Sequence, residues 1–184
     1  MESPAFFSIP YRVALNVTPL PEGSVLPEQA AFEASIPDIF RLASDVATLD
    51  SGALRGLRLV GDTARELADY LNLLSRKINA VMGHVLLQQD QAEFRHYSRE
   101  LGADQLLLDT RLPYSIGTLV EVKLFVSDEH VAIYALGEVV SHDDNSSRIR
   151  FVRLREQDQE LLIRATLHQQ TRLLRERAAR KEQP

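Results

Sequence analysis

The longest regular pattern of apolar residues in the chain has a period of seven and extends from residue 57 to residue 88. Two series of positions recur every seven residues, offset by three, and nine of these ten positions are apolar. A heptad pattern sustained over this length predicts a coiled coil. Residues 53–98 contain no proline, so we expect one long helix over most of that range. The apolar positions of its oligomerisation seam are Leu57, Val60, Ala64, Leu67, Leu71, Leu74, Ile78, Val81 and Val85.

The positions that flank this seam indicate how many helices it joins. A two-stranded coiled coil usually carries charged residues there. Here the flanking positions include Ala68, Tyr70 and Met82, which widen the apolar stripe and favour three or four helices. We expect a parallel homotetramer, with a trimer as the alternative, because the parallel arrangement gathers the polar Gln88 side chains at one hydrated end.

Before the long helix, the pattern predicts a strand, a linker and a shorter helix. Residues 11–17 alternate between apolar and polar, which is typical of a half-buried strand. Prolines and a glycine between residues 19 and 27 indicate an extended linker. From residue 36, apolar spacings of three and four predict a helix that begins at Pro37 and ends before Gly52. Together with the long helix, this segment would form a helical insertion over residues 36–98.

After residue 100 the apolar period becomes two. Strands are predicted at 105–109, 118–126, 131–141 and 148–154, separated by turn sequences, and a final helix follows from about residue 156. Because a lone strand cannot satisfy its backbone, we expect residues 11–17 to be the first strand of a barrel that residues 100–170 complete. The predicted fold class is α+β, a single domain over residues 1–184. It comprises a small antiparallel six-stranded β-barrel, two inserted helices and a C-terminal helix.

Composition and charge exclude several classes of protein. A chain of 184 residues that is 45% hydrophobic and 26% charged is expected to be globular. The absence of cysteine excludes disulfides and thiol chemistry. There is no apolar run long enough for a membrane span and no pattern typical of a signal peptide, so we expect a cytoplasmic protein. The net charge of −5 argues against nucleic-acid binding, although basic residues gather within residues 171–181 and keep a coiled-coil nucleic-acid module open.

Three segments of the second half resemble the PilZ family. LPYSIGTLVEVKL (112–124) is similar to the family's glycine-containing turn followed by a strand of the type hydrophobic-E-V-x-L. ALGEVV (135–140) resembles its glycine-containing strand, and IRFVRL (149–154), followed by acidic residues and a Leu-Leu pair, resembles its last strand and helix. The resemblance covers residues 100–170. It implies a six-stranded barrel and, in the family, a receptor for the bacterial second messenger cyclic di-GMP.

The two ligand motifs of that family are not retained in this chain. The Arg-x-x-x-Arg motif should fall within residues 1–10, which contain no arginine. Arg95 and Arg99 have the right spacing, but we expect them at the end of the long helix. The second motif aligns best with Glu100 through Gln105, where Gly102 replaces its serine. Because paired guanidinium groups supply much of the affinity for phosphates and guanine, we expect weak or absent binding, and Arg95, Arg99 and Glu100 remain the alternative ligand residues.

The sequence contains no recognisable catalytic constellation. The five histidines lack metal-protease spacing, the serines lie in no nucleophile elbow, and no phosphate-binding loop is present. We therefore expect no enzymatic activity, no cofactor and no metal. The favoured interpretation is a degenerate PilZ-like adaptor that self-assembles through the coiled coil and acts through protein contacts. The resemblance places such a protein in bacterial motility or virulence, and the alternative is a true cyclic di-GMP receptor with a divergent site.

Overall fold

A computed structural model describes residues 7–49, 62–126 and 131–181 of the chain. The strands in this part are β1 (Ile9–Pro10), β2 (Ala14–Pro19), β3 (Arg95–Leu101), β4 (Gln105–Leu108), β5 (Leu119–Val126), β6 (Val131–Asp143) and β7 (Ser146–Arg153). The α-helices are α1 (Gln29–Ser35), α2 (Asp38–Leu49), α4 (Asp62–Leu87) and α5 (Glu156–Lys181), and a 3-10 turn, η1, spans Ala92–Phe94.

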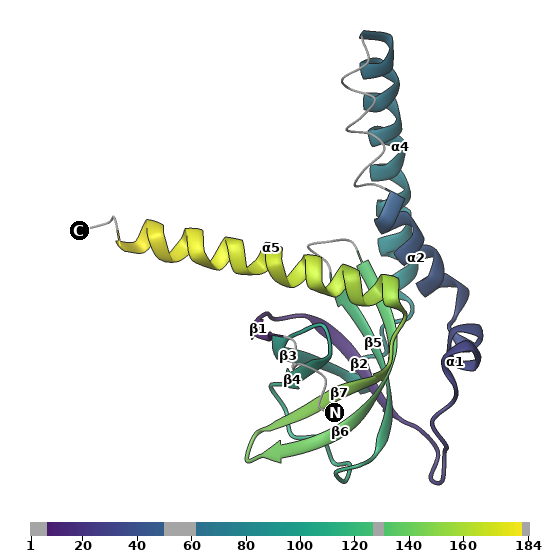
Figure 1. The fold of residues 1–184 in the computed structure, drawn as a ribbon, viewed down its shortest axis with the longest axis vertical. Coiled ribbons are helices and arrows are strands. Elements are labelled where there is room, and N and C mark those ends of the chain that lie inside the picture. Colours follow the sequence, from purple (N-terminus) through teal and green to yellow (C-terminus); the bar gives the residue numbers. More distant parts are fainter. Residues whose placement is uncertain (1–6, 50–61, 127–130, 182–184) are drawn as a thin grey trace.

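Six of the strands close into an antiparallel barrel. Their order is β3-β2-β5-β6-β7-β4, and a further pairing between β3 and β4 closes the ring. The two-residue β1 extends the edge beside the end of β3, where Ile9 lies opposite Leu101. The expected strand at residues 11–17 overlaps β2, which pairs with β5 over six residues. The predicted fold class, an α+β protein with a six-stranded barrel, is confirmed (Figure 1).

The sixth barrel strand lies in a segment for which the sequence pattern predicts a helix. We expected helix through residue 98, but α4 ends at Leu87 and residues 95–101 form β3. The backbone of this segment pairs with β2 on one side and with β4 on the other. These pairings provide hydrogen-bond partners for much of its backbone in place of those within a helix. The helical insertion therefore ends before β3, and α1, for which the sequence pattern predicted no element, lies between the linker at residues 19–27 and the predicted start of the insertion at residue 36.

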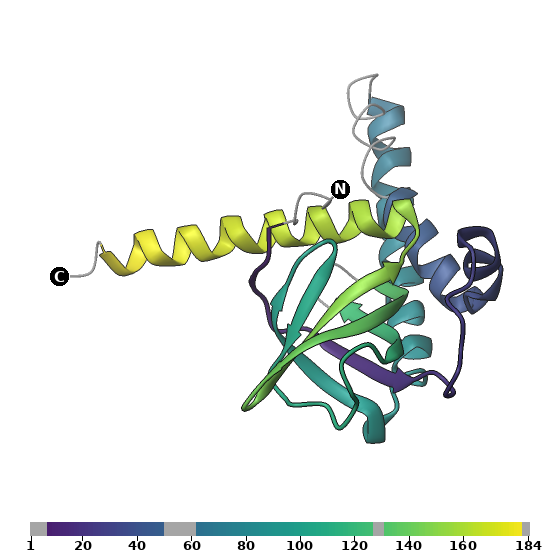
Figure 2. The ribbon, with the colours of Figure 1, turned by 60° about the horizontal axis from the view of Figure 1, so that its bottom comes forward.

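Two hydrophobic clusters organise the molecule around the sheet. The larger fills the barrel with alternating residues of β2, β5 and β6, and α5 contributes Leu161, Leu162 and Ala165 to it. The smaller lies on the outer face of β6 and joins it to α1, α2 and the C-terminal end of α4. β6 is consequently buried on both faces over most of its length. The insertion is thus attached to the outside of the barrel, and α5 packs against the barrel interior from another direction (Figure 2).

The two longest described helices project from this body in different directions. α4 extends away from the barrel beyond its contact with the smaller cluster, and the C-terminal half of α5 extends past the barrel wall (Figures 1 and 2). Neither helix, nor any other in the part of the chain that the structure describes, is both long enough and apolar enough to cross a membrane. The projecting surfaces are therefore the parts of the fold most available for contacts with other molecules.

Candidate functional site

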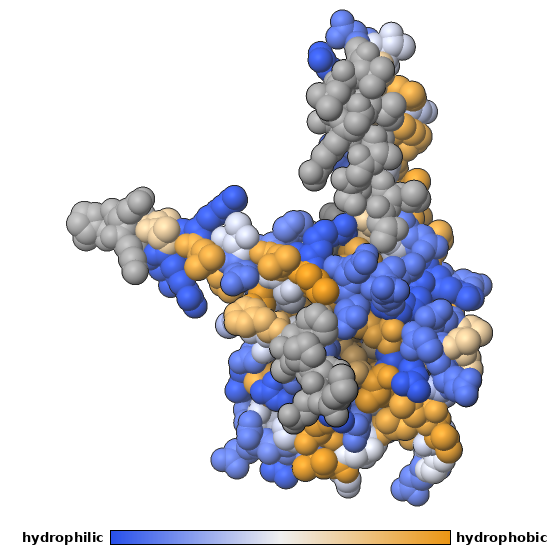
Figure 3. All heavy atoms as spheres, in the orientation of Figure 1, coloured by the Kyte–Doolittle hydropathy of each residue, from blue (hydrophilic) through white to orange (hydrophobic). Residues whose placement is uncertain are grey.

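One face of α4 carries a continuous line of exposed apolar side chains. Leu67 is 51% exposed, Ile78 is 48% exposed and Val81 is 64% exposed. Apart from the adjacent Leu73 and Leu74, successive members are three or four residues apart, so most of them lie on one side of the helix and Leu73 lies at its edge. We call this surface the α4 stripe, and its members are Leu67, Tyr70, Leu73, Leu74, Ile78 and Val81. The stripe appears as an orange edge along α4 in Figure 3.

A different face of α4 is buried within the chain and fixes the rotation of the helix. Ala68 is fully buried, and Met82 and Leu86 pack in the smaller cluster. There they join Phe40 of α2 and Tyr134 of β6. Because Met82 and Leu86 hold the C-terminal end of α4 against the body, the stripe points outward and stays exposed.

The structure brings the described positions of the predicted seam onto neighbouring faces of one helix. The members that are exposed are Leu67, Leu74, Ile78 and Val81. Three others are half-buried, namely Ala64, Leu71 and Val85. Leu57 and Val60 lie outside the described residues. The exposed apolar surface is therefore centred on the Leu67, Leu74 and Val81 series of the heptad, with Tyr70 and Ile78 beside it.

The segment that returns from α4 to the barrel is held by a buried asparagine on β2. Asn16 is 2% exposed, and its Nδ2 donates to Asp90 Oδ1 and to the Gln91 carbonyl, each at 3.0 Å. The Gln91 N–H donates to Asn16 Oδ1, also at 3.0 Å. Asp90 in turn pairs with Arg95 of β3 at 2.7 Å. Sequence reasoning placed Asn16 on the polar side of a half-buried strand and missed this role.

Aromatic rings connect the insertion to the outer face of the barrel. The ring centroids of Phe32 and Phe40 lie 6.1 and 5.8 Å from that of Tyr134, and Phe125 lies 6.2 Å from Phe40. The Tyr134 hydroxyl donates to Glu121 at 2.6 Å. Burial, reinforced by this carboxylate, raises the pKa of Tyr134 well above its usual value. The hydroxyl therefore remains a donor at any physiological pH.

The alternative ligand residues lie on β3, not at a helix end. Arg95 and Arg99 are exposed on either side of Tyr97. The guanidinium of Arg95 is paired with Asp90, and Glu100 accepts a hydrogen bond from Ser8 at 3.1 Å.

Beside these residues, Arg12 covers the ring of Tyr97, with its guanidinium carbon 4.0 Å from the ring centroid. It also pairs with Asp109 at 2.8 Å. Near Arg99, therefore, both Arg12 and Arg95 already have an acidic partner. Arg95, Arg99 and Glu100 do not form a closed pocket among the described residues.

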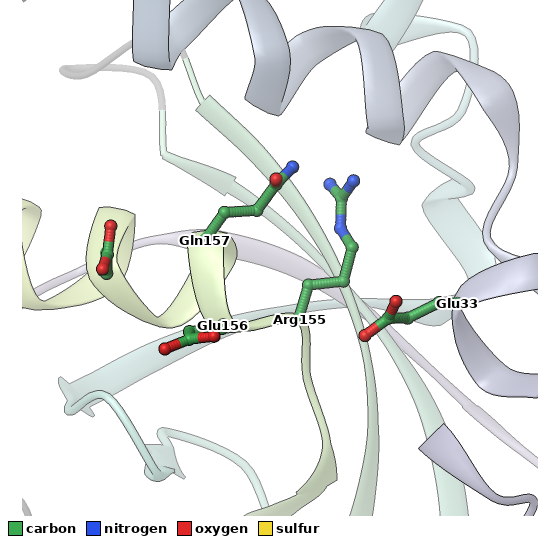
Figure 4. Close-up of a pocket in the computed structure, with 5 residues that line it drawn as sticks. Glu33, Arg155, Glu156 and Gln157 are labelled. Carbon is green, nitrogen blue, oxygen red and sulfur yellow. The ribbon is translucent and has the colours of Figure 1, made fainter. Parts of the chain in front are cut away.

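An open cavity of about 350 Å³ lies where α1 approaches the start of α5. Its lining residues are Glu33, Arg155, Glu156, Gln157 and Glu160, and Figure 4 shows them. The Arg155 guanidinium donates to both oxygens of Asp158, at 2.8 and 3.0 Å, and Ser44 Oγ donates to the same carboxylate at 2.6 Å. Burial raises the pKa of Asp158, while the bonds from Arg155 and Ser44 oppose that rise. Because this network joins α2 to α5, Arg155 has a structural role at this cavity.

The histidine that the sequence places beside two aspartates also has a structural role. His142 bonds through Nδ1 to Ser147 Oγ and through Nε2 to the Tyr114 carbonyl, both at 2.8 Å. These contacts tie the β6–β7 hairpin to the loop before β5. Within the described ranges, no group of three or more acidic or histidine side chains is placed to hold a metal ion.

Comparison with known proteins finds similarity at the level of the fold. No family model and no curated protein matches the chain. One similar solved structure is a pathogenic protein from Xanthomonas campestris, described as a tetrameric PilZ domain self-assembled through an unusual helical bundle. It superposes with a TM-score of 0.55 and 17% identity over 92% of this chain and 90% of that one. This similarity confirms the predicted PilZ fold.

Two further solved structures show weaker similarity. The Bacillus subtilis inhibitor of motility, MotI/DgrA, has a TM-score of 0.40 and 17% identity over 45% of this chain and 44% of that one. The PilZ domain of CeSA from a cellulose-synthesizing bacterium has a TM-score of 0.42 and 7% identity, and the match covers 89% of this chain and 98% of that domain.

Proposed function

Given the PilZ fold of the chain, we propose that it is a non-catalytic, cytoplasmic adaptor of bacterial signalling that assembles into a homotetramer through the α4 stripe. The observation that carries this proposal is the position of the stripe. It lies on a helix that projects from the barrel, and the internal contacts of that helix are made by a different face. A contiguous apolar surface in this position indicates a contact with other protein chains.

The free energy available from covering the stripe supports assembly. Burying a leucine or valine side chain completely stabilises by about 1.5–3 kcal/mol. The six members are between 36% and 64% exposed, so roughly 1 kcal/mol remains for each, or about 6 kcal/mol per helix. This gain offsets part of the entropy lost on association. A bundle of several helices covers both edges of the stripe, including Tyr70 and Leu73, better than a single pair does.

We propose a parallel arrangement, and the absence of native cysteine allows a direct test of it. Leu67 and Val81 lie seven residues on either side of Leu74. When Leu67→Cys chains and Val81→Cys chains are mixed and oxidised, a parallel bundle should crosslink only like positions, 67 to 67 and 81 to 81. An antiparallel bundle centred on Leu74 would instead crosslink position 67 to position 81. The tetrameric assembly described for the X. campestris protein supports four chains as the number to test first.

Assembly of this kind would place several barrels at one end of the bundle. Each barrel presents the same surfaces, so a multivalent partner would gain avidity from contacting several copies. This geometry suits a protein that acts by protein contacts. It also explains why a long helix would be inserted into a small barrel.

The assembly surface can be tested with a matched pair of variants. Leu74→Asp places a carboxylate in the centre of the stripe, and assembly would bury several such charges without partners. Leu42→Asp places the same charge on α2, where Leu42 is 51% exposed outside the stripe. Sedimentation velocity should show dissociation for Leu74→Asp alone. Equal behaviour of the two variants would contradict the proposal.

A cyclic di-GMP receptor remains the second candidate because the structure places Arg95 and Arg99 on the barrel surface, beside the segment that starts at Glu100. The pairing of Arg95 with Asp90 argues for weak binding. We expect a dissociation constant weaker than about 1 µM by titration calorimetry, equivalent to less than about 8 kcal/mol of binding free energy. Tighter binding, lost in Arg99→Ala, would make the receptor function the better account.

A further inference from the structure

The C-terminal helix α5 has two halves with different surroundings. In the first half, Leu161, Leu162 and Ala165 are buried in the barrel core, and Gln169 is 8% exposed. From residue 171 to residue 180 every side chain is exposed except Leu173, which is half-buried. This half extends past the barrel wall (Figures 1 and 2). The fold of the barrel therefore does not account for the second half of the helix.

An apolar line joins the two halves along the outer side of α5. Ile163 is half-buried, Leu167 is 55% exposed and Leu174 is 57% exposed. The spacings of four and seven residues keep them on one face, over roughly 16 Å of helix. Orange side chains along α5 in Figure 3 show exposed apolar surface among blue polar residues.

Beside this line is a small apolar groove of about 110 Å³ between α5 and the N-terminal part of the chain. We call it the α5 groove, and its main lining residues are Phe7, Ile9, Ala103, Ile163, Thr166 and Leu167. Phe7 is 69% exposed at its edge. The groove is large enough for a single apolar side chain, and Leu174 lies further along the same helix face.

The second half of α5 is strongly basic. Arg175, Arg177 and Arg180 are exposed, and Glu176 is the one acidic residue between positions 171 and 181. Arg175 and Arg177 lie on the two sides of Leu174 around the helix axis. The apolar line is thus bordered by cations in a protein whose net charge is −5.

We propose that the α5 groove and the adjoining apolar line bind an acidic amphipathic helix of a protein partner. A helix laid alongside α5 would place one apolar residue in the groove and another against Leu174, and its flanking carboxylates would meet Arg175 and Arg177. This inference rests on the proposed adaptor function, because it names the surface and the class of partner through which the adaptor would act. A lipid surface fits less well, because a membrane-bound helix needs a broad apolar face and α5 offers a narrow one.

The test is selection of binding peptides from a random library with the full chain as bait. We expect enriched peptides with apolar residues at helical spacing and a net negative charge. Their binding should fall at least tenfold in Leu167→Ser and in Arg175→Glu/Arg177→Glu. It should stay unchanged in Ile116→Ser, a control at an apolar residue that is 64% exposed in the loop before β5. Enrichment of neutral or basic peptides, or binding that is insensitive to Leu167→Ser, would overturn the inference, as would failure to enrich any peptide.

Two further measurements distinguish peptide binding from lipid or nucleic-acid binding, and the α5 groove from the α4 stripe. An enriched peptide should compete with neither anionic phospholipid vesicles nor duplex DNA, because the intact protein should bind neither. Vesicle or DNA binding that is lost in Arg175→Glu/Arg177→Glu would overturn the inference in favour of those ligands. Leu167→Ser should keep the wild-type mass, and Leu74→Asp should keep the peptide affinity per chain. Failure of the α5 groove is therefore distinguishable from failure of the α4 assembly.

Discussion

The junction between α4 and the barrel should depend on the single side chain of Asn16. Its amide makes three hydrogen bonds of 3.0 Å, two with the backbone of Gln91 and one with the carboxylate of Asp90. Asn16→Ala removes all three and leaves the Gln91 groups and Asp90 without that partner. Because Asp90 also holds Arg95, the variant should loosen the start of β3 together with the end of α4.

The expected loss of unfolding free energy in Asn16→Ala depends on the kind of each hydrogen bond and on the exposure of its partner to water. A neutral hydrogen bond contributes about 1 kcal/mol net, and one to a charged group contributes about 1.5–3 kcal/mol. The full sum would be near 4 kcal/mol. Gln91 is exposed, however, so water can replace part of what its backbone loses. We therefore expect the free energy of unfolding to fall by about 2–3 kcal/mol.

Urea denaturation followed by circular dichroism provides the assay. All samples need the same chain concentration, because self-association makes apparent stability depend on concentration. Thr18→Ala, at a half-buried residue on the same side of β2, is the matched control and should lose less than 1 kcal/mol. A loss below 1 kcal/mol in Asn16→Ala, or one equal to that of Thr18→Ala, would show that the Asn16 amide does not stabilise the junction.

Three further predictions concern the barrel and its pH dependence. Gly137→Ala should lower the free energy of unfolding by about 1–3 kcal/mol, because its new Cβ would lie 2.4 Å from Ile149 Cγ2. In a double-mutant cycle, Ile149→Ala should relieve part of this loss. Tyr134→Phe should lose about 1–2 kcal/mol with the bond to Glu121. Because the folded-state pKa of Tyr134 is raised, wild-type stability should fall as pH rises above about 10, and more steeply than in the variant. Burial lowers the pKa of His96, so stability should fall as pH drops below about 6.5, and His96→Gln should flatten this loss in acid denaturation curves.

The sequence predicts best those helices and strands whose apolar positions follow the period of the element and so indicate which face packs against other residues. The heptad between residues 57 and 88 predicts a helix with an apolar side, and in α4 four of the seven described seam positions are exposed and three are half-buried. The apolar alternation after residue 105 predicts β4 to β7, because each of these strands has one face in the barrel core, although β6 is buried on both faces over most of its length. In β5 this alternation is complete from Leu119 to Val126.

β3 could not be predicted from pattern because, of its two buried positions, the central one is polar and only Leu101 is apolar. Ser98 is 1% exposed, and its hydroxyl donates to the Tyr11 carbonyl at 2.6 Å and accepts from the Val13 N–H at 2.9 Å. A serine in this role resembles a surface residue in the sequence. Because residues 53–98 contain no proline, the predicted helix continues to residue 98. A helix can also end where the following residues pair in a β-sheet, as those of β3 do.

Two other features depend on tertiary contacts that cannot be predicted from the local sequence. The seven-residue α1 has no capping side chain and is held by Phe32, which is fully buried against Tyr134. Asn16 is buried because a distant segment returns across β2. For the candidate site, the sequence indicated the α4 stripe through its heptads, whereas the α5 groove arises only when Phe7 and Leu167 come together in the fold.

Assembly through α4 determines the mass of the wild-type protein in solution, which can be measured without any substitution. Light scattering coupled to size-exclusion chromatography measures this mass independently of shape, which matters for a molecule with two projecting helices. A tetramer formed through the α4 stripe should give a particle of four chains, each of 20.7 kDa, that persists on dilution into the low micromolar range. A mass of two or three chains would contradict the tetramer, and a mass of one chain, 20.7 kDa, would contradict assembly through the α4 stripe altogether.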